Sequence, residues 1–466
     1  MSLLSYQDPH VQALQYAFLN GRTVIDASDT GTGKTFTSCY LAKEEGFKPI
    51  IICPKAVLMT WKKTLDLFEV EYLGIANYEL MKGGSWFAYD PNRTGDLGEK
   101  EKCPYLEVTK TKGRRPSYKW IGISSDVVFI FDEAHRCKNK NTVNSKLLLA
   151  THETTGKKML LSATIADKPH FFAVFSVMLG FCQEVDEFKL FIKRLKYMGD
   201  ITSLGDYIRK CDTATPVMLQ LHKMVFPNHG SRMKISELGD AFPKNRIIAD
   251  TYVMDDDTTK AIQEAYQYIS IVSKEAAARE ALAICKLAEI IRARQKIEAL
   301  KVKAIVELTR DAVDDGNSVV IFVNYLDTMS LLVHELGVKC LVKGGQTIPE
   351  RQKMIDDFQE DKEHIIICQI QSGGVGISLH DTNGARPRIS IISPSWSAQD
   401  MMQTFGRIHR AGGKSMCIQK IVYCHGTVED RICQIVNDKL INYMHLNDGE
   451  PKSPKPAPKQ TPALDP

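Results

Sequence analysis

Two stretches of the chain show the same alternation of short apolar runs with segments whose apolar residues recur at helical spacing. The first stretch runs from about Thr23 to Leu161 and the second from about Val319 to Tyr423. Continuous apolar runs are typical of parallel strands buried on both faces, and the segments between them fit amphipathic helices. The pattern therefore predicts an α/β protein with two parallel-sheet lobes in tandem.

The region between the two stretches, from Lys168 to about Leu300, has few strand candidates and favours helices. Thr251–Met254 is predicted as a last strand before the lobes separate, with a hinge near Asp255. The predicted parts are a first lobe, 1–254, with a helical insertion at about 168–250; a second lobe, 255–446, with a helical insertion at about 255–300; and a flexible Pro/Lys tail, 447–466.

The composition of the chain restricts its possible location and partners but does not indicate an activity. The 466-residue chain carries a net charge of +4, so basic residues would have to gather in a cleft to bind nucleic acid. Its twelve cysteines show no paired Cys/His spacing, which predicts reduced thiols of an intracellular protein, in cytoplasm or nucleus, rather than a zinc site. The longest apolar run, Phe171–Cys182, is shorter than the about 20 residues of a membrane span, and no signal peptide pattern begins the chain.

The segment Gly83–Ser125 mixes aromatic residues, such as Trp86 and Trp120, with basic ones, such as Lys110. Interleaved basic and aromatic side chains can hold a nucleic-acid strand by charge and stacking. A β-hairpin insertion with a small aromatic core explains the pattern equally well. The sequence leaves both interpretations open.

The segment Ser28–Thr35 reads Ser-Asp-Thr-Gly-Thr-Gly-Lys-Thr between an apolar strand at Thr23–Ala27 and a helix at Phe36–Lys43. A glycine-rich loop in this position turns its backbone N–H groups around the phosphates of a nucleotide. Lys34 is predicted to neutralise the outer phosphates, and the hydroxyl of Thr35 to ligate Mg²⁺. The loop predicts a nucleoside-triphosphate site.

The sequence Asp132-Glu133-Ala134-His135 follows the apolar run Asp126–Phe131 directly. Open α/β sheets place their ligands at the carboxyl ends of the strands, where this run would deliver the two acids. Asp132 is predicted to hold Mg²⁺ through water, and Glu133 to orient and deprotonate the attacking water. Together with Lys34 they predict nucleotide hydrolysis.

A third polar segment lies in the second stretch, at Asp400–Arg410. Read as a helix, it places Gln403, Arg407 and Arg410 on one face. Guanidinium groups from a second lobe can stabilise the charge that develops on a transferred phosphoryl group. Arg407 and Arg410 are therefore predicted as catalytic residues.

The motifs, in the order in which they occur along the chain, resemble those of superfamily-2 helicase-like motors. Among these motors, they resemble the Swi/Snf-type DNA translocases. The resemblance covers nearly the whole chain, from Ser5 to His445. The resemblance implies two RecA-like lobes, with ATP and Mg²⁺ as cofactors. Tyr6-Gln7 resembles the adenine-recognising element, Leu161–Thr164 resembles motif III, and Thr427–Glu429 resembles the closing brace of the Swi/Snf-type branch. The ATP-binding residues implied are Tyr6, Gln7, Thr30, Gly31, Thr32, Gly33, Lys34, Thr35, Gly376 and Gln403.

The same resemblance implies residues that contact a nucleic-acid backbone. They belong to segments similar to motifs Ia, Ib, IV and V, the block that follows motif IV, and the tryptophan before motif VI. The residues implied are Pro54, Lys55, Asn77, Asn324, Gly344, Ser372, Gly373 and Trp396.

We expect an ATP hydrolase that moves on double-stranded DNA and remodels DNA or protein–DNA complexes. A strand-separating DNA or RNA helicase and an ATP-gated nucleic-acid clamp stay open as alternatives. Nucleic acid, double-stranded DNA above all, is the expected partner, no membrane is expected, and the motor is expected to act as a monomer. The Lys-Pro tail from Gly449 is a candidate protein-binding arm.

Overall fold

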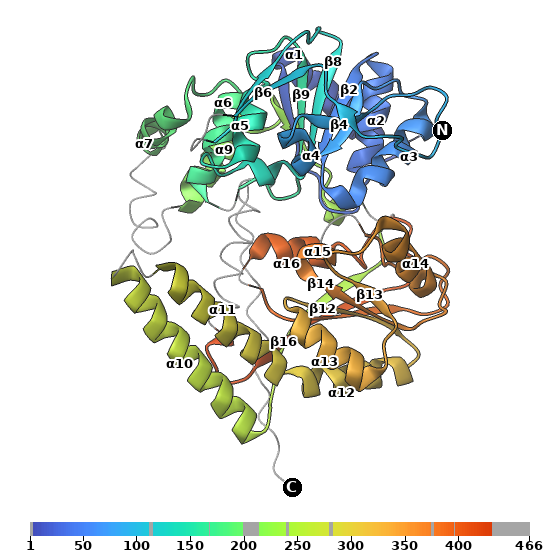
Figure 1. Cartoon of the computed structure of the whole chain (residues 1–466), viewed down its shortest axis with the longest axis vertical. Helices are drawn as coiled ribbons and strands as arrows, with labels where there is room; N and C mark the ends of the chain where they lie inside the picture. The colour runs from blue at the N-terminus through green and yellow to red at the C-terminus, as the bar shows by residue number, and fades with distance from the viewer. Residues whose placement is uncertain are drawn as a thin grey trace.

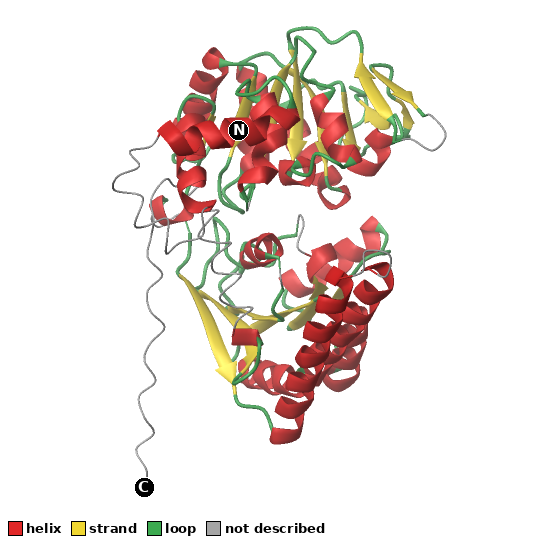
Figure 2. Cartoon of the chain, turned by 90° about the vertical axis from the view of Figure 1, so that its left-hand side faces the viewer, coloured by secondary structure: helices red, strands yellow, loops and turns green. Residues whose placement is uncertain are grey.

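The computed structural model describes residues 3–110, 115–166, 168–198, 214–238, 242–278, 283–373, 377–395 and 397–430. Figure 1 shows two lobes, one above the other, each built around its own sheet, and Figure 2 shows the same separation from the side. The predicted pair of α/β lobes is confirmed. No helix in the described ranges combines the length and the apolarity needed to cross a bilayer. The predicted Pro/Lys tail, 447–466, lies outside the described residues.

The first lobe has an eight-stranded sheet in the order β10-β1-β9-β8-β2-β3-β4-β5. Its first six strands run parallel, while β4 and β5 are added antiparallel at one edge. The strands are β1 (Thr23–Asp26), β2 (Lys48–Cys53), β3 (Gly74–Asn77), β4 (Ser85–Ala88), β5 (Glu101–Lys102), β8 (Val127–Asp132), β9 (Lys157–Leu161) and β10 (Gly230–Ser231).

Helices cover both faces of this sheet because successive strand residues point to opposite sides. Val24 and Ile130 pack with one set of helices, whereas Ile25 and Phe129 pack with the other. The first set is α1 (Asp8–Asn20), α2 (Lys34–Glu44) and α3 (Leu58–Phe68). The second is α4 (Tyr78–Lys82), α5 (Val143–Leu149), α6 (Ala173–Met178), α7 (Phe188–Met198) and α9 (Ala214–Val225). Short 3-10 helices are η1 (Lys55–Val57), η2 (Ala134–Cys137), η3 (Pro169–Phe172), η4 (Val185–Glu187) and η5 (Ile235–Glu237).

The second lobe has a six-stranded, fully parallel sheet in the order β11-β16-β15-β12-β14-β13. Its strands are β11 (Asn245–Tyr252), β12 (Ser318–Val323), β13 (Cys340–Val342), β14 (Ile365–Gln369), β15 (Arg388–Ile392) and β16 (Cys417–Cys424). One face packs on α12 (Val302–Asp314) and α13 (Leu326–Leu336). The other packs on α10 (Asp256–Ala278), α11 (Ala283–Leu300), α14 (Ile348–Gln359) and α16 (Ala398–Phe405).

The strand before the predicted hinge belongs to the second lobe, not the first. Asn245 to Tyr252 pair in parallel with Cys417 to Cys424 across eight residues. The predicted boundary at 254 is therefore corrected, because the chain has already joined the second sheet at 245. The helical insertion predicted at about 168–250 also contains β10, which extends the first sheet beside β1.

The aromatic segment 83–125 forms β4, β5 and a hairpin of β6 (Leu106–Thr109) with β7 (Ser117–Trp120). Trp86 and Trp120 are buried, and their rings contact Tyr105 and Phe129. The two tryptophans thus fill the core under the hairpin, which favours the insertion over the nucleic-acid grip.

Candidate active site

The loop between β1 and α2 is held in shape by short-range contacts. Gly31 and Gly33 have φ values of 88° and 95°, which favour glycine. A Cβ at Gly33 would lie 2.3 Å from Gln7 Nε2, so the glycine also lets Gln7 approach. Gln7 Nε2 donates to the carbonyl of Thr32 at 3.0 Å, and its Oε1 accepts the N–H of Leu4 at 3.0 Å. The loop is therefore tied to the segment that resembles the adenine-recognising element.

Lys34 begins α2 with its ammonium turned toward the loop. Its Nζ donates to the carbonyls of Ser28 at 2.8 Å and Asp29 at 3.0 Å. Asp29 in turn accepts Arg232 Nη2 at 2.7 Å and the N–H of Ile235 at 2.9 Å. A lysine at the positive end of a helix, above a loop of inward-facing N–H groups, makes an anion site.

Asp132 ends β8, and Glu133 follows with φ 53° and ψ 49°. This left-handed backbone is unusual for a glutamate and turns the chain sharply after the strand. Trp61 Nε1 donates to Asp132 Oδ2 at 2.9 Å, and the N–H of Glu133 donates to Asp132 Oδ1 at 2.9 Å. His135 Nδ1 lies 3.2 Å from Glu133 Oε2 and 3.0 Å from Ser162 Oγ.

The surroundings shift the pKa values of the two acids in opposite directions. Burial and the neighbouring charge of Glu133 raise the pKa of Asp132 to about 6. Burial would also raise the pKa of Glu133, but the hydrogen bond and charge of His135, with the charges of Lys34 and Arg407, lower it to about 2. Glu133 is thus the more acidic of the pair, a division typical of functional carboxylates.

The predicted helix through Arg410 is shorter than expected. α16 ends at Phe405, and Arg407 and Arg410 lie in the irregular segment after it. Directly after the helix lies Gly406, where a Cβ would lie 1.9 Å from Thr30 Oγ1 of the first lobe. The backbone of the second lobe therefore approaches the glycine-rich loop closely at this position.

Both guanidinium groups are fixed by the carbonyl of Ile377. Arg407 Nη1 donates to it at 3.2 Å and Arg410 Nη2 at 2.9 Å, while Arg410 Nε donates to the carbonyl of Gly406 at 3.1 Å. Burial lowers the pKa of Arg407 to about 10 and that of Arg410 to about 9, so both stay charged at neutral pH.

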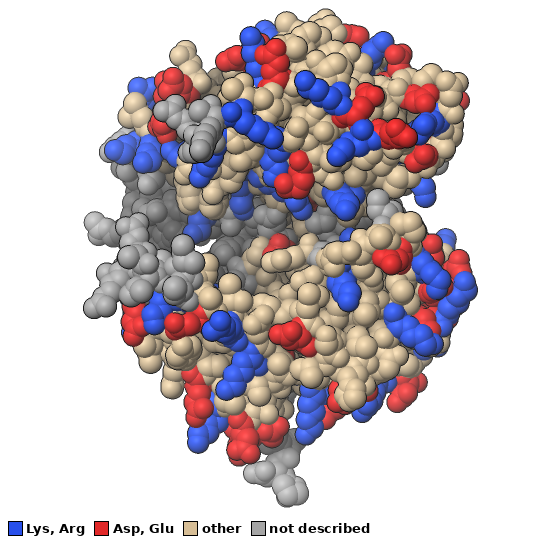
Figure 3. All heavy atoms as spheres, viewed as in Figure 1, with Lys and Arg blue, Asp and Glu red and all other residues tan. Residues whose placement is uncertain are grey.

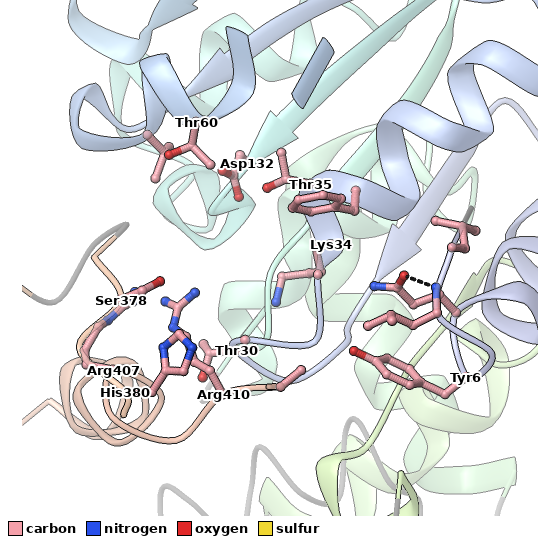
Figure 4. Close-up of a pocket in the computed structure, with 18 of the residues that line it drawn as sticks. Tyr6, Thr30, Lys34, Thr35, Thr60, Asp132, Ser378, His380, Arg407 and Arg410 are labelled. Atoms are coloured by element: carbon pink, nitrogen blue, oxygen red, sulfur yellow. Dashed lines mark hydrogen bonds between the residues drawn. The ribbon is translucent and has the colours of Figure 1, made fainter. Parts of the chain in front are cut away.

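These groups from both lobes line one cavity of about 470 Å³. Figure 4 shows Lys34, Thr35 and Asp132 on one side of it and Arg407 and Arg410 on the other. The predicted residues that line it are Tyr6, Gln7, Thr30, Gly31, Gly33, Lys34, Thr35, Asp132, Glu133, Arg407 and Arg410.

Of the residues predicted to bind ATP, two do not line this cavity and a third is not described. Thr32 is buried, and its Oγ1 donates to the carbonyl of Asp29 at 2.9 Å, so it holds the loop rather than lining the cavity. Gln403 is buried in α16 and is not among the lining residues. Gly376 lies outside the described residues.

Sequence reasoning missed Thr60, Ser378 and His380, which also line the cavity. It also missed Phe242, whose ring lies 6.4 Å from Tyr6 and 5.5 Å from His409. Phe242 thus touches both sides of the cavity from the connection between the lobes. No local pattern marks these four residues: Thr60 comes from α3, Ser378 and His380 come from the second lobe, and Phe242 comes from the connection between the lobes.

A second cavity, of about 610 Å³, opens between the lobes beside the first. Pro54, Lys55 and Gly344 of the predicted nucleic-acid set line it, and Figure 3 shows Lys and Arg side chains along the rims of the hollow. Basic side chains from both lobes contribute: Lys55, Lys63, Arg136, Lys343 and Arg351.

The rest of the predicted nucleic-acid set lies elsewhere. Asn77 caps α4 by accepting the N–H of Leu80 at 2.9 Å. Asn324 Nδ2 donates to Glu298 at 2.6 Å and to the carbonyl of Pro394 at 3.1 Å. Ser372 and Gly373 lie in α15 (Ile370–Gly373), whereas Trp396 lies outside the described residues.

Two family models match the chain. Residues 8–172 match the DEAD/DEAH box helicase family, and residues 300–412 match the helicase conserved C-terminal domain. The putative ATP-dependent RNA helicase L364 of Acanthamoeba polyphaga mimivirus is 35% identical over 459 residues, which cover 96% of this chain and 84% of that protein. The chain belongs to the superfamily-2 helicase-like ATPases. It is an ATP-hydrolysing enzyme, as predicted.

More distant relatives belong to the Swi/Snf-type branch, as the motifs of this helicase-like ATPase predict. The CHD3-type chromatin-remodeling factor CHR7 of Arabidopsis thaliana is 22% identical over 94% of this chain, which spans only 37% of that protein. The solved structure titled Sulfolobus solfataricus SWI2/SNF2 ATPase core in complex with dsDNA covers 95% of both chains, with 17% identity and a TM-score of 0.37. The helicase-named mimivirus relative and the chromatin-remodeling factor support a nucleic-acid-dependent ATPase.

Proposed function

We propose that this helicase-like ATPase uses ATP to move along double-stranded DNA and thereby remodels DNA or protein–DNA complexes. One observation carries the proposal: Lys34 and Glu133 of one lobe and Arg410 of the other line a single cavity. A triphosphate held by both lobes favours their closed arrangement, and hydrolysis removes that preference. Repeated closing and opening can then shift one lobe along a bound strand.

The residues present fit ATP with Mg²⁺. The loop at Gly31 and Gly33 makes a cradle without side chains, beside the N-terminus of α2. Lys34 would hold the outer phosphates, Thr35 and Asp132 would hold Mg²⁺, and Tyr6 with Gln7 would border the base. The metal supplies charge neutralisation on the phosphates when bound.

In hydrolysis, Glu133 would act as the general base, because it lines the cavity beside Asp132 and Lys34. His135 Nδ1, which lies 3.2 Å from Glu133 Oε2, would orient the Glu133 carboxylate. Arg407 and Arg410 would stabilise charge on the γ-phosphoryl oxygens.

The basic cavity between the lobes is the proposed path of the nucleic acid. Lys55 and Arg136 come from the first lobe, and Lys343 and Arg351 from the second, so both lobes can hold one phosphate backbone. Such contacts predict binding that weakens steeply with salt and depends little on sequence. A DNA duplex is favoured by the Swi/Snf-type relatives, whose names include chromatin remodelling and DNA excision repair.

A strand-separating RNA helicase is the second candidate, since the mimivirus relative carries that name. ATPase rates measured in parallel with duplex DNA, single-stranded DNA, duplex RNA and no polymer test the choice. We expect the largest stimulation with duplex DNA, together with triplex displacement and no unwinding of a forked duplex. Stimulation by RNA alone, or unwinding of the forked duplex, would contradict the proposed translocase and support a strand-separating helicase.

A further inference from the structure

A separate cavity of about 280 Å³ lies at the opposite end of β1 from the ATP loop. Thr23, the first residue of β1, lines it, whereas Asp26, the last, leads into the loop. The other walls come from the turn before β1, the segment after α5, the end of α6 and the residue before β10. This cavity is therefore distinct from the ATP site and from the basic cavity between the lobes.

Four basic side chains line this cavity: Arg22, His152, Lys158 and His229. None of the described residues that line it carries a carboxylate. Glu153, which follows His152, is exposed and is not among the lining residues, although its charge acts on His152. The ionisable side chains among the described lining residues are thus all basic.

Lys158 is the central group, because its side chain is only 2% exposed. Its ammonium donates to the carbonyl of Thr154 at 3.0 Å, and the same oxygen also accepts Arg22 Nη1 at 3.3 Å. An ammonium has three protons to donate, and no described residue pairs with Lys158 through a carboxylate. A buried cation without a counter-ion is costly, so an anion in the cavity would stabilise it.

His229 supplies a second feature of a built anion site. Its Nδ1 is buried and has no hydrogen-bond partner among the described residues. Burial lowers the pKa of His229, so the imidazole is neutral at pH 7 and can still donate one N–H. Gly21 lies beside this nitrogen, since a Cβ there would be in ordinary contact with it at 3.7 Å.

We propose that this cavity binds a small phosphate dianion, either inorganic phosphate or the phosphate of a phosphomonoester, between Lys158 and His229. Arg22 at the mouth adds a second positive charge, and the volume limits the ligand to a phosphate with a small substituent. Met178 and Leu179 form an apolar wall on one side, which a substituent such as a ribose could contact. Nothing in this proposal depends on the role of the ATP site.

The test uses the full chain with Lys34→Ala, because the ATP loop also attracts phosphate. Isothermal titration with inorganic phosphate, and separately with ribose 5-phosphate, should show one binding event in this background. Adding Lys158→Met should weaken it at least about 10-fold, since a charged hydrogen bond is lost. The matched control is Lys157→Met, whose ammonium donates to the carbonyl of Phe18 instead and should leave binding unchanged.

Tighter binding of ribose 5-phosphate than of inorganic phosphate would identify the ligand as a phosphomonoester, and the reverse would identify free phosphate. Affinity should fall as the pH rises through about 8, because burial and Arg22 lower the pKa of Lys158 to about 8 and the neutral amine no longer attracts the anion. If Lys158→Met does not fold, His229→Leu should still weaken binding several-fold. No phosphate binding in the Lys34→Ala protein, or equal binding after either substitution in the cavity, would overturn the proposal.

Discussion

The two halves of the ATP cavity are built differently. The first-lobe half stands on regular elements, with Asp132 at the end of β8 and Lys34 at the start of α2, and partners within the same lobe fix each of them. The second-lobe half lies in an irregular segment after α16, and its backbone packs on Thr30 across the lobes. The first half is therefore preformed, whereas the second depends on how closely the lobes approach.

The largest loss of ATPase activity is expected when a guanidinium group is removed from the second-lobe half. Arg410→Ala is expected to lower kcat by about 10³-fold or more, because a charge on the transferred phosphoryl group loses its partner. ATP affinity should change far less, since the first-lobe half stays intact. ATPase kinetics and binding of a fluorescent ATP analogue measure the two effects, with the exposed Arg310→Ala as control. A near-normal kcat would remove Arg410 from the site.

Glu133→Gln tests the preformed half with nearly the same side-chain volume. Loss of the general base should lower kcat by about 10³-fold, while ATP binding persists. Single-turnover hydrolysis separates the chemical step from nucleotide release. The exposed Glu153→Gln should behave as the unchanged protein. Retained hydrolysis in the Glu133 variant would contradict the role proposed here.

Gly406→Ala tests the contact between the two halves of the ATP cavity and changes no charged group. The new Cβ would meet Thr30 Oγ1 at 1.9 Å, so the two lobes must move apart. A displacement of about 1 Å at a reacting centre can cost about 10²-fold in rate, and we expect a loss of that size in kcat. Gly21→Ala is the control, since its Cβ would have only ordinary contacts. Unchanged kcat in the Gly406 variant would show that this approach is not required.

The same contrast explains what the sequence could predict. The loop at Lys34 and the acids at Asp132 are local patterns, since a strand, a turn and a helix start lie next to one another in the chain. Their positions followed from the order of apolar and polar residues. Their roles stay predictions until the variants above are measured.

The second-lobe half depends on distant contacts and was predicted less well. α16 ends at Phe405, and the residue after it, Gly406, lies against Thr30, which is far away in the sequence. β11 was assigned to the wrong lobe because its partner, β16, follows more than 150 residues later. Phe242 carries no local signal for its contacts with Tyr6 and His409.

The smallest expected effect concerns the charge of Asp132 within the preformed half. Trp61 Nε1 donates to this carboxylate at 2.9 Å and so favours its ionised form, against burial and the charge of Glu133, which raise its pKa to about 6. Trp61→Phe removes the donor, so the pKa should rise by about one unit. A protonated Asp132 cannot hold a cation, and activity should therefore fall at a higher pH than before.

The pH profile of kcat/KM reports this group in the free enzyme. Its acidic midpoint should move from about pH 6 to about pH 7 in Trp61→Phe, with little change at pH 8. Tyr78→Phe is a matched control, because the Tyr78 hydroxyl donates to the backbone carbonyl of Asp132 and not to its carboxylate. An equal midpoint in both variants would mean that the protonation of Asp132 does not limit turnover. A midpoint shifted only by Trp61→Phe would instead place the charge of the preformed half under the control of one buried indole.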